Sequence, residues 1–316
     1  MARPPHLDFP LLVAGANAVS PGASPKALRG KLKFLMEFAR LKNQFHEFFS
    51  RPENDALLQE VVAQPKMLGF VVWPYIHAGW SALQRFEALS QHQRAIGSDI
   101  AALALKPDDL LEIADMSSVS PGLRLVVDRA PWCLREGSLV FNQFLNEERM
   151  MSIAFSFGER GGERVAYVGS VQGSHIDSAL EKYREIAKGL QGMRSRDFLI
   201  KAFQFMTFHL GVKRLLCVSE AQRHHQHPFF RKSKMDKLHL NYDEIWTEHG
   251  GEPGSDGFFE LGRLPIVRAM DTIAAKNRPL YRRRYALMDQ LSRDIASRFA
   301  DHTDDVGKRV THGVTR

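Results

Sequence analysis

Cysteine is almost absent from the sequence, which has only Cys133 and Cys217 among its 316 residues. The two are far apart and form no CxxC pair, so a disulfide framework and a thiolate metal or redox site are excluded. Reduced thiols are typical of the cytoplasm. We therefore expect a cytoplasmic protein, either free or peripheral to the inner membrane.

Long hydrophobic runs are also missing. The best apolar run, residues 67–73, is far shorter than the roughly 18 residues that a helix needs to cross a bilayer. The stretch 9–19 imitates a secretion signal, but Asp8 adjoins it and Pro10 interrupts it. The sequence therefore predicts neither a membrane-spanning helix nor a secreted protein.

The familiar catalytic motifs are absent as well. There is no HExxH zinc motif and no GxSxG nucleophile motif, which argues against two common classes of hydrolase. No helix-turn-helix signature or aromatic RNA-binding pattern is visible, so we expect no nucleic acid as a partner. We also expect no metal site, because His224, His225 and His227 adjoin one another without a cysteine pair or a spaced carboxylate.

The overall composition is that of a folded globular protein. Hydrophobic residues make up 44% of the chain and charged residues 25%, which rules out disorder as the dominant state. Lysine and arginine outnumber aspartate and glutamate by 43 to 36, giving a net charge of +7. This balance predicts an anionic ligand, such as a phosphate-bearing small molecule, or peripheral contact with an anionic membrane.

The chain divides into four parts by composition and hydrophobic period. Residues 1–23 are predicted to be a flexible N-terminus, and residues 301–316 a disordered tail. Residues 24–118 are predicted to be a helical region, and residues 119–300 an α+β domain.

The helical region carries apolar residues at helical spacing, with prolines between the periodic segments. The spacing is clearest in its first segment, at Leu28, Leu32, Leu35, Met36 and Ala39. We expect three or four helices up to about residue 97, followed by a loop-rich connection over 106–122.

In the second half the hydrophobic period changes to two, which is typical of strands. Four strands are predicted, at 123–127, 139–145, 151–157 and 165–171. Short turn-rich gaps between them favour an antiparallel meander. The next elements are expected to be helices over 176–190 and 197–210, a strand over 213–219, a strand over 257–261 and a helix over 278–299. The strand at 213–219 follows a helical crossover, so it should lie parallel to the last meander strand. The predicted sheet is therefore mixed and mostly antiparallel.

Five motifs in this half occur in an order that resembles one bacterial family. They are AYVGSVQG at 166–173, GVKRLLCVS at 211–219, NYDEIW at 241–246, GFFEL at 257–261 and LYRRRYALMD at 280–289. Together they resemble the VirK/YbjX family over roughly residues 121–295. The resemblance implies a role in virulence, envelope stress and resistance to cationic antimicrobial peptides, but it assigns no catalytic residue.

A meander that leads through a helix into a parallel strand is also the core of GNAT-type acyltransferases, and we expect a GNAT-like core here. The first functional hypothesis is therefore an acyltransferase that uses an acyl-CoA-type donor. In that architecture an acyl-CoA donor lies where the two parallel strands spread apart. In this sequence those strands would be 164–171 and 213–219. The mouth of the crevice would carry the ligand-binding candidates Gln172, Gly173 and Ser219.

The loop at 191–196 would hold the pyrophosphate of such a donor, because Arg194 and Arg196 suit phosphate oxygens. These arginines, however, stand where the usual acyl-CoA pattern has small residues. His225 and His227 are the candidates for a general base, since they follow the strand at 213–219.

The alternative is a non-enzymatic protein that binds an anionic envelope component, such as a phosphate or a lipid head group. The run 281–285 places Arg282, Arg283 and Arg284 between two tyrosines on one helix. Such a cluster can bind phosphate. Alternatively, the tyrosines pack inward and the arginines pair with acidic residues, in which case the cluster is structural.

Overall fold

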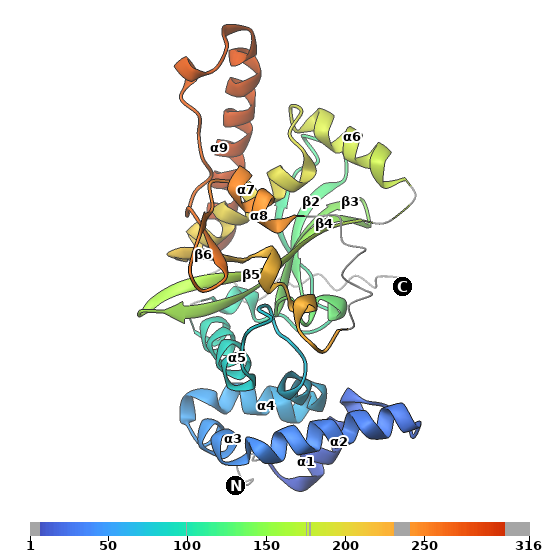
Figure 1. Cartoon of the computed structure of the whole chain (residues 1–316). Coiled ribbons are helices and arrows are strands. Elements are labelled where there is room, and N and C mark those ends of the chain that lie inside the picture. Colours follow the sequence, from blue (N-terminus) through green and yellow to red (C-terminus); the bar gives the residue numbers. More distant parts are fainter. Residues whose placement is uncertain (1–6, 99, 175, 177, 231–240, 301–316) are drawn as a thin grey trace.

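Capping residues and apolar periodicity together build the helices of the first hundred residues. The computed structural model of the chain describes residues 7–98, 100–174, 176, 178–230 and 241–300 (Figure 1). Ser24 caps α2 by accepting a hydrogen bond from the amide of Ala27, and Ser81 forms a reciprocal capping box with Gln84 at the start of α5. The helices of this part are α1 (Phe9–Val19), α2 (Pro25–Arg40), α3 (Lys42–Phe49), α4 (Asp55–Ala63) and α5 (Ala82–Gly97). The four from α2 to α5 confirm the expected number.

Helix α1 corrects the expectation of a flexible N-terminus for residues 9–19. Asp8 caps it by accepting a hydrogen bond from the amide of Leu11 at 2.9 Å. Leu11 and Ala16 are buried, and Gly15 lies so close to Leu68 that a side chain at this position would collide with it. The cap and the burial of Leu11 and Ala16 hold these residues in a helix, although Pro10 and Gly15 lie within the segment. The predicted tail, 301–316, lies outside the described residues.

The second half forms one mixed sheet of eight strands among the described residues, in the order β1-β2-β3-β4-β5-β6-β8-β7. Its strands are β1 (Leu111–Asp115), β2 (Leu123–Asp128), β3 (Leu139–Leu145), β4 (Glu148–Arg160), β5 (Glu163–Gly173), β6 (Arg214–Val218), β7 (Glu252–Pro253) and β8 (Phe258–Leu261). Only β5 and β6 pair in parallel; the other neighbours are antiparallel. The predicted meander and its parallel continuation are therefore confirmed, and the protein is α+β.

Four helices accompany the sheet: α6 (Ala179–Gly189), α7 (Ser195–His209), α8 (Tyr242–Glu248) and α9 (Arg278–Ala300). Helices α6 and α7 form the crossover between β5 and β6. Three of the elements were not predicted. Strand β1 lies in the segment 106–122 that was expected to be a loop, and no element was predicted where α8 and β7 lie. The sheet thus begins earlier in the chain than the predicted domain boundary at residue 119.

Each face of the sheet is covered by different elements. On one face, Phe203 of α7 packs edge-on against Phe155 of β4, and His92 of α5 stacks on Phe157. On the other face, the buried hydroxyl of Tyr75 bonds Ser156 of β4 at 2.5 Å. Helices α1 to α4 lie at one end of the molecule and α9 projects at the other (Figure 1). In the part of the chain described here, no helix is both long and apolar enough to cross a membrane.

Candidate functional site

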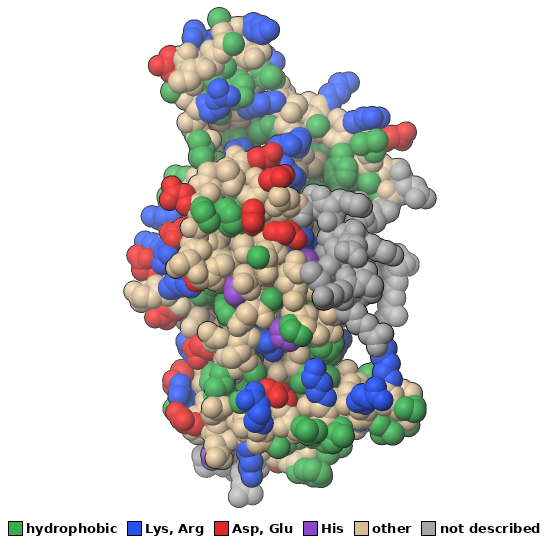
Figure 2. Space-filling view, in the orientation of Figure 1, with side chains coloured by type: hydrophobic (Ala, Val, Ile, Leu, Met, Phe, Trp, Pro, Cys, Tyr) green, Lys and Arg blue, Asp and Glu red, His purple; other side chains and the backbone are tan. Residues whose placement is uncertain are grey.

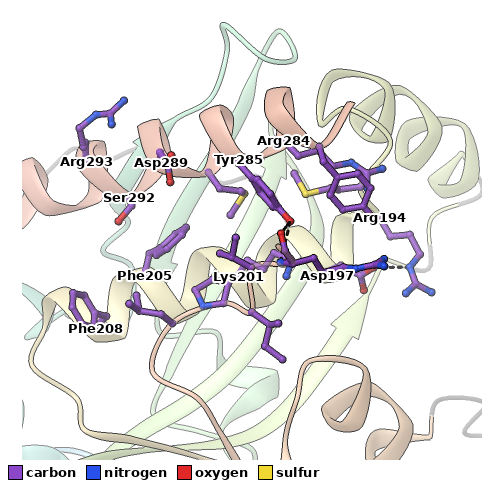
Figure 3. Close-up of a pocket in the computed structure, with 18 of the residues that line it drawn as sticks. Arg194, Asp197, Lys201, Phe205, Phe208, Arg284, Tyr285, Asp289, Ser292 and Arg293 are labelled. Carbon is purple, nitrogen blue, oxygen red and sulfur yellow. Dashed lines mark hydrogen bonds and ion pairs between the residues drawn. The ribbon is translucent and has the colours of Figure 1, made fainter. Parts of the chain in front are cut away.

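A pocket of about 810 Å³ opens between α7, α9 and the extended segment 264–268 (Figure 3). Both helices contribute a face at helical spacing. From α7 the pocket is lined by Lys201, Phe205 and Phe208, and from α9 by Tyr281, Tyr285, Met288 and Ser292. Residues three and four apart on a helix lie on one side, so these sets form continuous walls. The opposite side of α7 is buried against the sheet.

The walls of the pocket are largely apolar. The segment 264–268 supplies Leu264, Ile266 and Val267, each of which remains well exposed to solvent. This segment is held to α9 by Tyr285, whose hydroxyl accepts a hydrogen bond from the backbone amide of Arg268 and donates one to its carbonyl, both at 3.0 Å (Figure 3). A large apolar surface open to solvent is typical of a ligand-binding or docking site.

Cationic side chains surround these walls. The lining includes five cations, Arg194, Lys201, Arg268, Arg284 and Arg293, against two carboxylates, Asp197 and Asp289. In Figure 3, Arg194 and Arg284 lie near one end, Arg293 lies near the other and Lys201 lies between them. The pocket therefore combines apolar walls with a positive charge excess.

Asp197 neutralises part of that charge. Its carboxylate bonds Arg194 Nε at 2.6 Å, Arg196 Nε at 3.3 Å and His249 Nε2 at 3.5 Å. Burial acts to raise the pKa of Asp197, but His249 and the two arginines outweigh it and hold this pKa well below its usual range. Glu248 also bonds both arginines, at 3.0 and 2.6 Å. Arg194 and Arg196, the predicted phosphate ligands, are thus already paired with acids. Of the two, only Arg194 lines the pocket.

Lys201 lies in the pocket without such a partner. Among the described residues, its ammonium has no hydrogen bond or ion pair, and burial lowers its pKa, an effect that Asp197 partly opposes. A buried cation gains more from an anionic partner than an exposed one does, because water screens the interaction less. Lys201 is therefore the side chain in this pocket best suited to an incoming anion.

Arg284 reaches the pocket across the turn that joins α6 to α7. Its Nε donates a hydrogen bond to the Gln191 carbonyl at 2.8 Å, and its guanidinium lies 5.2 Å from the centre of the Tyr281 ring. The next residue, Gly192, has a φ of +74°, and a Cβ there would lie 3.1 Å from Arg284 Nη2. A glycine is favoured at this point because it tolerates both the left-handed backbone and the close guanidinium.

The other two arginines of the 282–284 cluster take different positions. Arg283 donates to the side-chain oxygen of Gln191 at 2.9 Å, and Arg282 is exposed and does not line the pocket. None of the three pairs with an acidic side chain among the described residues. Among the described residues the cluster is thus not held by salt bridges, and it contributes Arg284 alone to the pocket. Phosphate binding by the three arginines stays a prediction.

The crevice expected for an acyl-CoA arm is filled by the chain itself. Strands β5 and β6 do part after four residue pairs, but α8 enters the gap. The hydroxyl of Tyr242 accepts a hydrogen bond from the Val171 amide at 2.9 Å and donates one to its carbonyl at 3.0 Å, and Trp246 Nε1 donates to the Val218 carbonyl at 2.9 Å. Both aromatic side chains are fully buried. This corrects the expectation of an open crevice at this point.

The residues predicted at the mouth of that crevice also have structural partners. Gly173 lies where a Cβ would be 2.9 Å from the Tyr183 hydroxyl, so the close approach it permits is to α6. The amide of Ser219 donates to the Gly257 carbonyl at 3.0 Å and extends the pairing of β6 with β8. These two residues lie outside the pocket between α7 and α9.

Gln172 belongs to a buried cluster around Glu136. The Glu136 carboxyl accepts hydrogen bonds from the Gln172 side-chain amide and from Ser170 Oγ, the latter at 2.9 Å, and lies 3.4 Å from His224 Nδ1. Burial raises the pKa of Glu136 to about 7 and lowers that of His224 to about 3. Burial thus favours the uncharged form of both partners. Glu136 was not predicted, because it lies in a loop far along the chain from Ser170, Gln172 and His224.

The predicted general bases do not meet the pocket. Burial lowers the pKa values of His225 and His227 to about 4. His227 Nε2 accepts a hydrogen bond from Arg85 Nη2 of α5 at 3.0 Å. His227 thus contacts α5 of the helical region, and neither histidine lines the pocket that contains Lys201 and Arg284.

Comparison with protein families identifies the relatives of this fold. The model of a family described as protein of unknown function (DUF535) matches residues 24–297. The chain belongs to the DUF535 family. The match includes the N-terminal helices α2 to α5 as well as the sheet. A relative named YbjX confirms the resemblance to VirK/YbjX proteins.

Three curated relatives of this DUF535 protein carry names that state no function. The uncharacterized protein YbjX of Escherichia coli K12 is 24% identical over 246 residues, covering 75% of this chain and 73% of YbjX. An uncharacterized protein of Haemophilus influenzae is 30% identical over 150 residues, which cover 48% of this chain and 48% of that protein. A second Haemophilus protein is 25% identical over 225 residues, covering 70% of this chain and 72% of its own. No solved structure matches the chain, so the GNAT-like core stays a prediction.

Proposed function

We propose that this DUF535 protein binds an anionic amphiphile in the pocket between α7 and α9, and that it does so without catalysing a reaction. The ligand class is a single apolar chain with a phosphate or carboxylate head. The observation that carries the proposal is the position of Lys201 among apolar walls formed by Phe205, Phe208 and the 264–268 segment. Lys201 is half-buried and has no ion pair among the residues that the structure describes.

The two parts of such a ligand would meet complementary surfaces. The head group would accept charge-assisted hydrogen bonds from Lys201 and from the guanidinium of Arg284, whose Nε alone is bound to Gln191. The hydrocarbon chain would cover Leu264, Ile266 and Val267, which are otherwise exposed to water. An amphiphile of this kind also fits the envelope role that the VirK/YbjX resemblance implies.

Acyl transfer is less well supported by the same geometry. It required an acyl-CoA donor between β5 and β6, where Tyr242 and Trp246 are packed. It also required phosphate to bind Arg194 and Arg196, which are paired with Asp197 and Glu248. We therefore propose binding as the function of the pocket.

The test uses the full chain and dodecyl phosphate below its critical micelle concentration, with dodecanol and inorganic phosphate as matched probes. We expect dodecyl phosphate to raise the melting temperature more than either probe, because it alone can contact both the cations and the apolar walls of the pocket. Lys201→Met should weaken its binding about tenfold or more in calorimetric titration, since a hydrogen bond to a charged group contributes about 1.5–3 kcal/mol.

Two further variants make the result specific. Ile266→Ser should weaken the binding of dodecyl phosphate and leave the melting-temperature shift caused by inorganic phosphate unchanged. Arg184→Gln on α6 removes an exposed cation outside the pocket and should change nothing. Equal binding of dodecanol and dodecyl phosphate, or equal losses in Lys201→Met and Arg184→Gln, would refute the proposal.

A further inference from the structure

Helix α2 has two apolar faces, and only one of them is buried. The buried face carries Phe34 and Phe38, which pack into the helical core. The other face carries Leu28, Leu32 and Met36, whose exposed fractions are 55%, 58% and 63%. At 100° per residue these three lie within about 80° of one another and roughly opposite the buried phenylalanines. The apolar spacing that predicted this helix therefore belongs mainly to its solvent-facing side.

A basic row runs beside the exposed apolar row. Arg29 and Lys33 each follow a leucine of that row by one residue, and Lys26 lies on the same side. In the part of the chain that the structure describes, these three cations form no hydrogen bond or ion pair, although Arg40 is paired with Glu37. The outer side of α2 is thus an apolar row flanked by Lys26, Arg29 and Lys33, of which Lys33 interacts electrostatically with Glu37 one turn away.

Helix α1 adds exposed apolar side chains beside α2. No residue from 9 to 25 is ionisable, and Phe9 and Val13 of α1 are exposed. Helix α1 packs against α2 at the same end of the molecule (Figure 1). In Figure 2 hydrophobic side chains alternate with lysine and arginine over this end.

We infer that the outer face of α1 and α2 docks on the surface of an anionic lipid bilayer. A helix with an apolar row and an adjoining basic row lies in the plane of a membrane, with the apolar side chains among the acyl chains and the cations at the phosphates. The long lysine and arginine side chains reach the head groups while their stems stay beside the apolar row. This face is distinct from the pocket between α7 and α9, and the inference does not depend on the ligand of that pocket.

The charges decide between a bilayer and a second protein surface. A second copy of this chain would bring Lys26, Arg29 and Lys33 towards the same cations, because a two-fold contact pairs identical faces. A bilayer that contains anionic lipid instead supplies neutralising charge along the whole row, and each such cation strengthens binding about fivefold.

The experiment measures co-sedimentation of the full chain with vesicles of phosphatidylcholine alone and with 30% phosphatidylglycerol. We expect binding to the anionic vesicles only, weakened by salt because exposed charges are screened. The double variant Arg29→Gln/Lys33→Gln should bind about 25-fold more weakly, and Leu28→Gln/Leu32→Gln should lose binding even at low salt. Both should keep the wild-type melting temperature, since the four side chains are exposed.

Helix α6 offers matched controls. Arg184→Gln/Lys188→Gln removes two exposed cations at the same spacing, and Leu180→Gln removes a leucine with 61% exposure. These variants should bind vesicles as the wild type does. Equal losses in the α6 and α2 charge variants would mean that net charge alone causes binding and would overturn the inference.

A second measurement reports the position of α2 directly. An environment-sensitive dye on Met36→Cys should shift to the blue when anionic vesicles are added, and a dye at Leu180→Cys should not; Cys133 and Cys217 are buried. Absence of the shift at residue 36, or a dimer in light scattering that Leu28→Gln/Leu32→Gln converts to a monomer, would refute docking on a bilayer.

Discussion

At the scale of single residues, Glu136 makes the stability of the protein depend on pH. Burial raises its pKa from 4.5 to about 7. Between these values the folded state holds a proton that the unfolded state releases, so the free energy of unfolding falls as pH rises through this window and levels off above it. The loss amounts to about 3 kcal/mol for a shift of this size.

The variant Glu136→Gln should remove this dependence, because glutamine keeps the shape and one acceptor but does not titrate. We expect it to gain about 3 kcal/mol relative to the wild type between pH 5 and pH 8 in urea unfolding. Two stability profiles that remain parallel over this range would contradict the assignment to Glu136.

At the scale of elements, α8 replaces a missing piece of the sheet. Where β5 and β6 part, the Tyr242 hydroxyl bonds both backbone groups of Val171. Tyr242→Phe should therefore leave a buried N–H and C=O unpaired and lower the free energy of unfolding by about 2–4 kcal/mol. Tyr281→Phe, whose hydroxyl has no hydrogen-bond partner among the described residues, is the matched control. Equal stability of the two variants would show that Tyr242 acts through packing alone.

The elements differ in how well the sequence predicts them. Strands β2 to β6 and the long helices were predictable, because they have a clear period and turn residues at their ends. Strand β1 was not, since an irregularity between Glu112 and Ala114 breaks its alternation. Helix α8 has only seven residues, too few for a periodic signal. Helix α1 was hidden because its interior contains glycine and asparagine.

The candidate site was predictable only in part, because local sequence marks some of its residues and not others. Arg194 and Arg284 were identified as ligand-binding residues from local sequence, and the fold brings both to one pocket. Lys201 was missed because a lone lysine on an apolar helix has no sequence signature. Lys201 becomes part of a pocket only because α9 packs against α7, and a contact between distant parts of the chain cannot be seen in local sequence.

At the scale of the whole molecule, the two proposed surfaces lie at opposite ends. The α1–α2 face is at one end and the pocket beside α9 is near the other (Figure 1). Substitutions far apart with no shared partners usually act independently. The double change Leu32→Gln with Lys201→Met should therefore combine the vesicle defect of the first with the amphiphile defect of the second, without either defect altering the other in parallel titrations.

The parallel pairing of β5 with β6 also has a consequence for the order of folding. Strands β1 to β5 follow one another along the chain and need only short loops to close, whereas β6 must wait for the whole of α6 and α7 to be placed. During synthesis, the meander is complete before β6 leaves the ribosome. The parallel seam is thus joined only after the meander, and α8, which follows β6 in the chain, closes its open end through Tyr242 and Trp246.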